Sequence, residues 1–257
     1  GAQWGHGAMG NARWMGVRLR DVLDLAGVKA GAQAVRFSGL DRPTVDGAPW
    51  YAKSLPLDRA RDGEVMIAFA MNGAALPMLN GFPIRLVVPG WYSTYWIKAL
   101  DRIEVISGAD DNFWMAKAYR IPTTPTGGVA PGTKDFPSTP ISAMVPRSFV
   151  TSIADGAALR SGEPVALGGL AMGGNAGVAR VELRVDDGAW QAATLAADHG
   201  RYSFRRWTAR APALARGPHR ISVRCTNTNG QTQNSVALWN PSGYQRGVIE
   251  TIRVIAQ

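Results

Sequence analysis

Two basic residues enclose a polar loop near the middle of the sequence. Arg85 lies in the apolar run 84–88, and Lys98 follows a loop that carries Ser93 and Thr94. Guanidinium and ammonium groups, hydroxyls and backbone amides are the groups that bind phosphate in proteins. The alternative is that both charges are solvated at the ends of a buried strand, which is the usual state of such residues. Spacing alone favours the solvated charges, so an anion site here needs further support.

A second cluster of aromatic and basic residues, Tyr202–Trp207, lies in the C-terminal half. Successive side chains of a strand point to opposite faces, so Arg205 is expected on the face opposite Phe204 and Arg206. An arginine on that face can bind an oxyanion through two parallel hydrogen bonds. Alternatively, both arginines lie on the surface and pack over aromatic rings, and the residues alone favour this second interpretation.

The composition favours an anionic ligand over a nucleic acid. The 257 residues carry a formal net charge of +9, yet the arginines are scattered along the sequence. Nucleic-acid-binding domains usually gather such charge with aromatics in one patch. The sequence has no apolar stretch of the ~20 residues that a membrane-spanning helix needs. We therefore expect a protein without a nucleic-acid partner and without a membrane span.

Several common catalytic motifs are absent from the sequence. His6, His199 and His219 are far apart, and there is no C-x-x-C or H-x-x-x-H spacing, which argues against a zinc site built by the protein. Neither the nucleophile elbow G-x-S-x-G nor the phosphate loop G-x-x-x-x-G-K-[ST] occurs. The single cysteine, Cys225, stands among alternating strand-like residues. We expect it to be a small buried side chain rather than a reactive thiol.

The first half of the sequence mixes helical and strand-like patterns. Apolar residues recur at helical spacing over 17–28, where Gly27 provides a stop, and a short helix is expected over 56–60. Strands are expected at 34–38, 51–55, 65–71, 84–88 and 97–106. These elements do not alternate with the regular period of a parallel wound sheet, so a mixed α+β layer fold is predicted.

Short alternating strands dominate the second half. They are expected at 141–145, 164–171, 179–185, 201–207, 220–226 and 248–255. Asp186-Asp187-Gly188 is expected to form a hairpin turn because glycine accepts the positive φ that a tight turn requires. This pattern predicts an all-β immunoglobulin-like sandwich without the antibody disulfide. The segment 123–140, rich in Pro and Gly, is either a linker between two domains or a long ordered loop.

Four stretches of the sequence resemble the sulfite oxidase family, which includes the bacterial sulfite dehydrogenases. They are 7–23, 39–41, 71–90, and 204–207 together with 240–244. The most specific is the third, with Met71-Asn72-Gly73, Gly81-Phe82-Pro83-Ile84-Arg85 and Val88-Pro89-Gly90. The resemblance covers essentially the whole sequence in order. It implies that residues 1–135 are the C-terminal part of a molybdopterin-binding oxidoreductase domain, and that residues 136–257 are an immunoglobulin-like dimerisation domain.

The resemblance also implies roles for individual residues. The positions that match those holding the pterin and its phosphate are Asp41, Asn80, Arg85, Trp96, Ile97 and Lys98. Tyr119 matches the active-site tyrosine beside the molybdenum, although from the residues alone a ring stacked at the start of a loop is the preferred interpretation. Arg205 matches the substrate-pocket arginine of the second domain, and Arg206 is its competitor if the register is shifted by one. An arginine and a tyrosine hydroxyl would neutralise and orient a small oxyanion while the cofactor performs the oxidation.

The activity implied by the resemblance is the oxidation of sulfite to sulfate with a molybdenum-molybdopterin cofactor and a c-type cytochrome as electron acceptor. No haem-attachment motif C-x-x-C-H occurs in the sequence, so any haem is expected on a separate subunit. The implied enzyme is a periplasmic homodimer. The family's molybdenum-ligating cysteine is expected upstream of Gly1, so the sequence is interpreted as N-terminally truncated, with little activity alone and no metal ligand of its own. The alternatives are a sulfane dehydrogenase of a thiosulfate-oxidising complex and a metal-free binding or scaffold protein with this fold.

Overall fold

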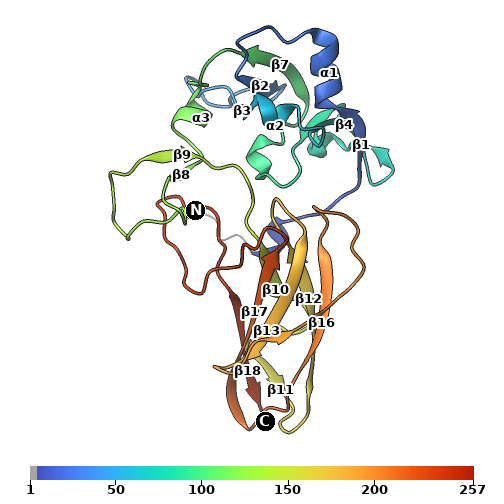
Figure 1. Ribbon diagram of the computed structural model, residues 1–257, viewed down its shortest axis with the longest axis vertical. Helices are drawn as coiled ribbons and strands as arrows, with labels where there is room; N and C mark the ends of the chain where they lie inside the picture. The colour runs from blue at the N-terminus through green and yellow to red at the C-terminus, as the bar shows by residue number, and fades with distance from the viewer. Residues whose placement is uncertain (1–4) are drawn as a thin grey trace. The chain divides into compact units, whose positions relative to one another are not determined.

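The computed structural model describes residues 5–257, which form two compact units (Figure 1). The mixed unit comprises residues 12–142 and 240–244, and the sandwich unit comprises residues 5–11, 143–239 and 245–257. Among the described residues, no helix is long and apolar enough to cross a membrane. The predicted class, an α+β region followed by a β sandwich, is confirmed. The immunoglobulin-like assignment of the sandwich stays a prediction.

The mixed unit contains short helices and small antiparallel sheets. Its helical segments are α1 (Leu19–Ala26), α2 (Leu57–Ala60), α3 (Phe113–Ala116), η2 (Met78–Asn80) and η3 (Ser93–Tyr95). Its strands are β1 (Trp14–Arg18), β2 (Ala34–Gly39), β3 (Ala52–Pro56), β4 (Met66–Met71), β5 (Ala74–Ala75), β6 (Arg85–Val87), β7 (Leu100–Ile106), β8 (Arg120–Pro122) and β9 (Ser138–Pro140). One sheet joins β1, β4, β5 and β6, a second has the order β3-β2-β7, and β8 pairs with β9.

Helix α1 places its apolar side on the core of the mixed unit. Leu19 and Leu23, one helical turn apart, are both buried, and Gly27 ends the helix with a φ of 74°. The helix begins at Leu19 rather than at the predicted residue 17. The reason is that Trp14–Arg18 form β1, whose hydrogen bonds to β4 compete with an earlier helix start.

The core of the mixed unit also anchors the loop between η3 and β7. Tyr95, Ile97 and Leu100 are buried and pack in the same cluster as side chains from α1, β2 and β6. Trp96 is partly buried and packs against the same cluster, whereas Lys98 is exposed. The core therefore fixes the path of this loop and leaves the Lys98 side chain outside it.

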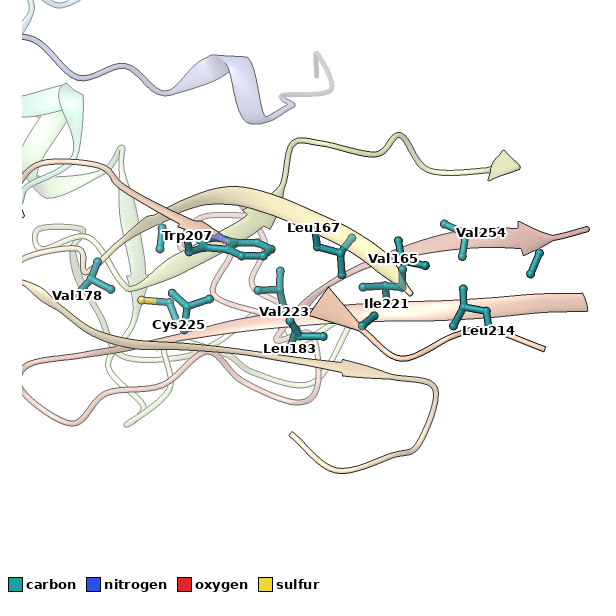
Figure 2. Packing of buried hydrophobic residues seen from close by; sticks show 14 residues of the cluster. Val165, Leu167, Val178, Leu183, Trp207, Leu214, Ile221, Val223, Cys225 and Val254 are labelled. Atoms are coloured by element: carbon teal, nitrogen blue, oxygen red, sulfur yellow. The ribbon is translucent and has the colours of Figure 1, made fainter. Parts of the chain in front are cut away.

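The sandwich unit is built from two sheets of mainly antiparallel strands. Its elements are η1 (His6–Ala8), β10 (Arg147–Val150), β11 (Ala157–Leu159), β12 (Val165–Met172), β13 (Val178–Val185), β14 (Gln191–Ala192), β15 (Thr194–Leu195), β16 (Arg205–Ala211), β17 (Gly217–Asn227) and β18 (Glu250–Ala256). The sheet orders are β10-β12-β16-β15 and β11-β18-β17-β13-β14. Buried side chains from both sheets meet in one apolar core, shown in Figure 2. Cys225 lies in this core, as predicted for a structural cysteine.

Trp207 is the largest side chain of the sandwich core, and a glycine makes room for it. Trp207, labelled in Figure 2, is 1% exposed. Its ring lies against Gly169 of the neighbouring strand β12. A Cβ on Gly169 would come within 2.4 Å of the Trp207 ring and 2.1 Å of the Phe149 carbonyl oxygen. The sequence pairs a small and a very large residue across the strands, which fills the core without a steric clash.

Two predicted strands of the second half are wrong in their placement. Residues 141–145 form no strand, and the first strand of the sandwich is β10, because residues 141 and 142 hydrogen-bond to loops of the mixed unit instead. The predicted strand 201–207 begins only at Arg205, since residues 200–203 form a turn closed by a hydrogen bond from Ser203 to Gly200. Alternation from this start places Arg205 on the same face as Trp207.

The segment 123–140 is an ordered loop of the mixed unit. Its end, β9, pairs with β8, and the Thr123 amide donates to the Pro137 carbonyl oxygen. Because this hairpin holds residues 136–140 to the mixed unit, the two compact units divide after Ser142. The predicted domains, with their boundary between residues 135 and 136, stay a prediction.

The predicted hairpin turn at Asp186-Asp187-Gly188 connects β13 and β14, but its geometry differs from the expectation. The positive φ, 50°, belongs to Asp186 rather than to Gly188. Asp186 tolerates this conformation because its carboxylate is tied down by the Arg220 amide and the His219 ring.

Candidate functional site

A small cleft in the mixed unit brings together four of the six predicted cofactor-binding residues. Its lining consists of Gly39, Asp41, Tyr51, Ser93, Thr94, Trp96, Ile97 and Lys98. These residues come from the end of β2, the start of β3 and the segment from η3 to β7. The cleft holds about 150 Å³. Since a water molecule takes ~30 Å³, this volume suits a phosphate-sized group or one edge of a larger ligand.

Glycine allows the walls of the cleft to approach each other. A Cβ on Gly39 would lie 2.3 Å from the Lys98 carbonyl oxygen. Gly81, with a φ of 104°, lies equally close to the Lys98 backbone, where a Cβ would come within 2.9 Å of the Lys98 Cα. Any side chain at either position would push the Lys98 segment away from the cleft.

The polar groups of the cleft are fixed in place and partly unsatisfied. The Tyr51 hydroxyl donates to the Thr94 carbonyl oxygen over 2.7 Å, and the Trp96 indole donates to the Trp91 carbonyl oxygen. The Lys98 ammonium group donates to the Leu79 carbonyl oxygen over 3.1 Å, which leaves two of its three protons available. The Thr94 hydroxyl is buried and has no hydrogen-bond partner among the described residues. A cleft lined by a residue with an orphaned hydroxyl and by a lysine is the pattern expected where an anion binds.

Arg85 supports the wall of the cleft instead of lining it. The side chain is 8% exposed and donates to the Asn80 carbonyl oxygen over 2.9 Å and to the Trp96 carbonyl oxygen over 3.1 Å. Its guanidinium group also lies over the rings of Trp14 and Trp96. Burial lowers the pKa of Arg85, and its Nε has no partner among the described residues. Arg85 therefore joins the two segments that carry the predicted ligands Asn80 and Trp96, and Asn80 takes part through its backbone.

Tyr119 lies in a cluster of aromatic rings that begins at the wall of the cleft. Its ring stacks on Tyr244 at a centroid distance of 5.9 Å and meets Tyr51 edge-on at 6.3 Å and Trp114 at 6.0 Å. Tyr119 has a φ of 52°, an uncommon conformation for an aromatic residue. The Tyr119 carbonyl oxygen accepts a hydrogen bond from the Ile141 amide, which holds this conformation. Because Tyr51 lines the cleft, the Tyr119 ring is one side chain away from it.

Tyr244 and Lys53 belong to this cluster, and neither was predicted. Residues 240–244 resembled the dimerisation domain of the family, but the structure groups them with the mixed unit. Lys53 is fully buried, and its Nζ lies 5.5 Å from the centroid of the Tyr119 ring. Residues 52–55 of β3 are all buried, so burial does not alternate along this strand. A pattern of period two therefore does not show which face of the strand carries Lys53. The one available signal was a lysine inside an otherwise strand-like run.

Arg205 lies in the sandwich unit at the start of β16 and is half-buried. Its guanidinium group donates to the carbonyl oxygens of Ala196 and Val178 and lies 3.4 Å from the Asp198 carboxylate. Arg206, the competing candidate, is exposed. These contacts distinguish the two arginines within the sandwich unit. The predicted role of Arg205 at a substrate stays a prediction.

The described residues contain no group of three or more His, Cys, Asp or Glu side chains that could hold a metal ion. Cys225 donates to the Met172 carbonyl oxygen inside the sandwich core, and burial raises its pKa to about 12. A thiol in this environment stays protonated and is not a metal ligand.

Comparison with known proteins agrees with this site. Residues 1–114 match the family model of the oxidoreductase molybdopterin-binding domain. The chain is 35% identical to human mitochondrial sulfite oxidase over 261 residues, covering 95% of this chain and 46% of that protein. It is 34% identical to chicken sulfite oxidase, covering 98% of this chain and 56% of that protein. The chain thus spans about half the length of these relatives.

A solved structure shows the same fold. The sulfane dehydrogenase SoxCD from Paracoccus pantotrophus superimposes with a TM-score of 0.74 over 93% of this chain and 59% of that chain, at 24% identity. The cleft also fits the cofactor of the matched domain model. The Lys98 ammonium group, the orphaned Thr94 hydroxyl and the close glycine backbone suit a phosphate, and the Trp96 segment can border a flat ring. With the sequence matches and the fold in agreement, the chain belongs to the sulfite oxidase family and carries a molybdopterin-binding domain.

Proposed function

We propose that this chain is part of a molybdenum-cofactor oxidoreductase that oxidises sulfite to sulfate and passes the electrons to a c-type cytochrome. The observation that carries the proposal is the cleft in which Asp41, Trp96, Ile97 and Lys98 come together, with Asn80 and Arg85 bonded into its wall. The similarity to sulfite oxidases from human and chicken supports sulfite as the substrate.

Different residues of the chain would have different roles in this reaction. Conversion of sulfite and water to sulfate releases two protons and two electrons, and the bound molybdenum cofactor supplies the redox chemistry. Lys98, Ser93 and Thr94 would bind the cofactor phosphate, and Arg85 would hold the segments on which it rests. The Tyr119 hydroxyl would donate a hydrogen bond to the substrate oxyanion, and Arg205 would neutralise its charge.

The proposal extends to the setting of the enzyme. We propose a periplasmic homodimer whose haem, if it has one, is carried by a separate cytochrome subunit. These features follow from the family resemblance. Each sulfite releases two electrons, so a one-electron acceptor such as a c-type cytochrome is reduced twice per turnover.

The test is made on the complete protein that contains this chain. After purification, the molybdenum and pterin contents are measured together with sulfite-dependent reduction of cytochrome c. Tyr119→Phe is expected to lower kcat/KM about 100-fold with unchanged cofactor content, because it removes one hydrogen-bond donor to the reacting oxyanion. Arg102→Met, which alters an exposed side chain of β7, serves as the control and should match the wild type.

Two results would contradict the proposal. One is a purified protein that retains no pterin, which would favour a binding or scaffold role for the fold. The other is a cofactor-loaded protein that ignores sulfite but oxidises protein-bound sulfane sulfur, which would assign the alternative sulfane dehydrogenase activity.

A further inference from the structure

Lys53 is a buried cation that the roles proposed above leave unexplained. It lies in the middle of β3 and is 0% exposed. Its Nζ donates one hydrogen bond, over 2.8 Å, to the Trp114 carbonyl oxygen. Among the described residues, no carboxylate forms an ion pair with it. A charged group in such a place is costly unless something nearby compensates the charge.

Two tyrosine rings bracket the ammonium group. Nζ lies 4.6 Å from the centroid of the Tyr95 ring and 5.5 Å from that of the Tyr119 ring. The faces of aromatic rings attract cations, but each contributes less than a carboxylate would. The cavity around Lys53 therefore leaves most of its positive charge uncompensated. That charge lies directly behind the ring whose hydroxyl faces the proposed substrate.

Elsewhere in the same unit, the half-buried cation Arg36 is paired with a buried acid. Arg36 of β2 donates to Asp110 over 2.6 Å, and the Asp110 side chain is 2% exposed. This ion pair compensates both charges locally. Lys53 lies on the neighbouring strand, opposite Phe37, and has no such partner. Lys53 thus lacks a direct ion pair, although the more distant Asp110 carboxylate attracts its charge.

We propose that Lys53 is a positioning residue for the substrate anion: its ammonium ion lies behind Tyr119 and strengthens the binding of a small oxyanion at the Tyr119 hydroxyl. This inference rests on the proposed function, since it requires an anionic substrate beside Tyr119. With charges separated by about 8 Å in a protein environment, a unit positive charge is expected to improve anion binding on the order of tenfold.

The ionisation of Lys53 offers a way to detect this effect. Burial lowers the pKa of Lys53 to about 8; Arg120 lowers it further and Asp110 opposes the shift. The folded protein should therefore lose the ammonium charge between pH 7 and pH 9, and the affinity for the anion should fall over the same interval.

The other groups that face Lys53 are not expected to produce this change. Tyr51, which directly precedes β3, and Tyr95 of η3 have pKa values that burial raises above the ordinary value. On the α3 side, burial raises the pKa of Asp110, but hydrogen bonds from Arg36, Ser54 and Asn112 overcome this and hold it below the ordinary value. Arg36 and Arg120 are guanidinium groups that stay charged. The remaining group that faces Lys53 is the Tyr119 ring itself.

The experiment measures sulfate binding and sulfite turnover by the holoenzyme between pH 7 and pH 9. Sulfate is the probe for binding because its charge is constant in this pH range. Its binding is measured by tryptophan fluorescence and by inhibition of sulfite turnover. Lys53→Met is expected to weaken sulfate binding and to raise KM for sulfite about tenfold at pH 7, with kcat within about twofold. Lys117→Met, at an exposed lysine just after α3, is the matched control and should match the wild type.

A second variant keeps the test decisive if Lys53→Met fails to fold. Lys53→Arg retains a charge that does not titrate, so it should bind sulfate equally well at pH 7 and pH 9, whereas the wild type loses affinity. The inference is overturned if Lys53→Met binds sulfate normally, or if Lys53→Arg shows the same loss above pH 8. A lysine with only a structural role would lower the melting temperature and leave the pH dependence of binding unchanged.

Failure of the proposed function gives a different result. If the wild-type holoenzyme does not oxidise sulfite but binds sulfate in a Lys53-dependent way, the proposed activity is wrong, and the proposed role of Lys53 in anion binding is supported. If the wild type oxidises sulfite and both variants behave like it, the activity stands and Lys53 has no part in it.

Discussion

The two units of the molecule bury different kinds of polar side chain. In the sandwich unit the fully buried polar residues are neutral: Ser148, Ser222, Thr226, Asn227 and Gln233. In the mixed unit two cations, Lys53 and Arg85, are buried to a similar degree. Neither cation has a carboxylate partner among the described residues; both donate to backbone carbonyl oxygens.

In the sandwich unit, by contrast, a largely buried cation is paired with an acid. Arg147 donates to Glu250 over 2.6 Å, and both side chains are largely buried. Two of its neutral buried groups are also matched: the Asn227 amide donates to the Gly173 carbonyl oxygen and the Gln233 amide to the Val248 carbonyl oxygen. The buried Ser148 hydroxyl and the Trp207 indole N–H have no partner among the described residues. The contrast between the units therefore concerns how buried charge is compensated and does not extend to every buried polar atom.

Uncompensated buried charge therefore marks the region where a ligand is expected. Burying an unpaired cation lowers the stability of a fold, so it is retained where an anion completes the arrangement. The comparison predicts that changes in the sandwich core affect stability alone. Changes to the buried charges of the mixed unit should affect stability and cofactor content together.

The largest effect is expected from Trp207→Ala in the sandwich core. The substitution removes the largest fully buried side chain and leaves a cavity beside Gly169, which should lower the free energy of unfolding of the sandwich unit by about 4 kcal/mol. Denaturant unfolding followed by circular dichroism measures this change. Trp207→Phe should cost clearly less. If the alanine variant lost cofactor while its stability was unchanged, the separation of roles between the units would be wrong.

A smaller loss, of about 3 kcal/mol, is expected from Asp110→Asn in the mixed unit. Asp110, whose side chain is 2% exposed, compensates Arg36 and accepts a hydrogen bond from Ser54, so its replacement leaves a half-buried guanidinium group without its acid. Burial raises the pKa of Asp110, but the hydrogen bonds from Arg36, Ser54 and Asn112 prevail and hold it below the ordinary value.

The pH dependence provides the check on Asp110. A carboxyl group whose pKa is depressed in the folded state stabilises the protein above the pKa of the unfolded chain, ~3.9, and this stabilisation is lost as the pH falls below it. Wild-type stability should therefore fall more steeply on acidification than that of Asp110→Asn. Parallel acid-unfolding curves would show that the ion pair contributes nothing measurable.

Arg85→Met should combine a moderate loss of stability with loss of cofactor. The variant deprives the Asn80 and Trp96 carbonyl oxygens of their donor, at a cost of about 2 kcal/mol, and frees the wall of the cleft. Pterin content after purification should fall well below that of the Arg102→Met control, whose altered side chain is exposed. Full pterin content in Arg85→Met would show that cofactor binding does not need the hydrogen bonds from Arg85 to the Asn80 and Trp96 carbonyl oxygens.

Prediction from the sequence succeeded where one face of an element is buried. α1 and most strands were located because Leu19 and Leu23, or the alternating buried residues of β2, follow the period of their element. The prediction failed at 141–145, a strand-like run whose residues 141 and 142 form backbone hydrogen bonds to loop residues instead of to a strand. It failed also at the start of β16, where a turn takes the residues before Arg205.

The site was predicted through the family resemblance, and only partly. Asp41, Trp96, Ile97 and Lys98 meet at one cleft, but the buried clamp role of Arg85 depends on the path of two loops that no pattern encodes. Lys53 was missed because every residue from 52 to 55 is buried, so alternation carries no information there. Tyr244 was missed because a segment distant in the sequence returns to stack on Tyr119.

The smallest expected effect concerns His219 in the sandwich unit, where a cation is held at a hairpin without any ligand role. Its Nδ1 lies 2.8 Å from the Asp186 carboxylate and its Nε2 lies 2.8 Å from the Ala215 carbonyl oxygen. Both partners only accept hydrogen bonds, so the doubly protonated ring satisfies them best, and the hydrogen bond to Asp186 raises the pKa of His219. A raised pKa means that the stabilisation is complete below the pKa of the unfolded chain, ~6.5, and is lost as the pH rises through the folded value. The pair is partly exposed, so the loss should stay below about 1 kcal/mol.

His219→Gln, which can donate but does not titrate, should remove this dependence of stability on pH between pH 6 and pH 8 and leave cofactor content unchanged. A cofactor loss in this variant would mean that cations of the sandwich unit also serve the ligand, and the contrast between the two units would fail.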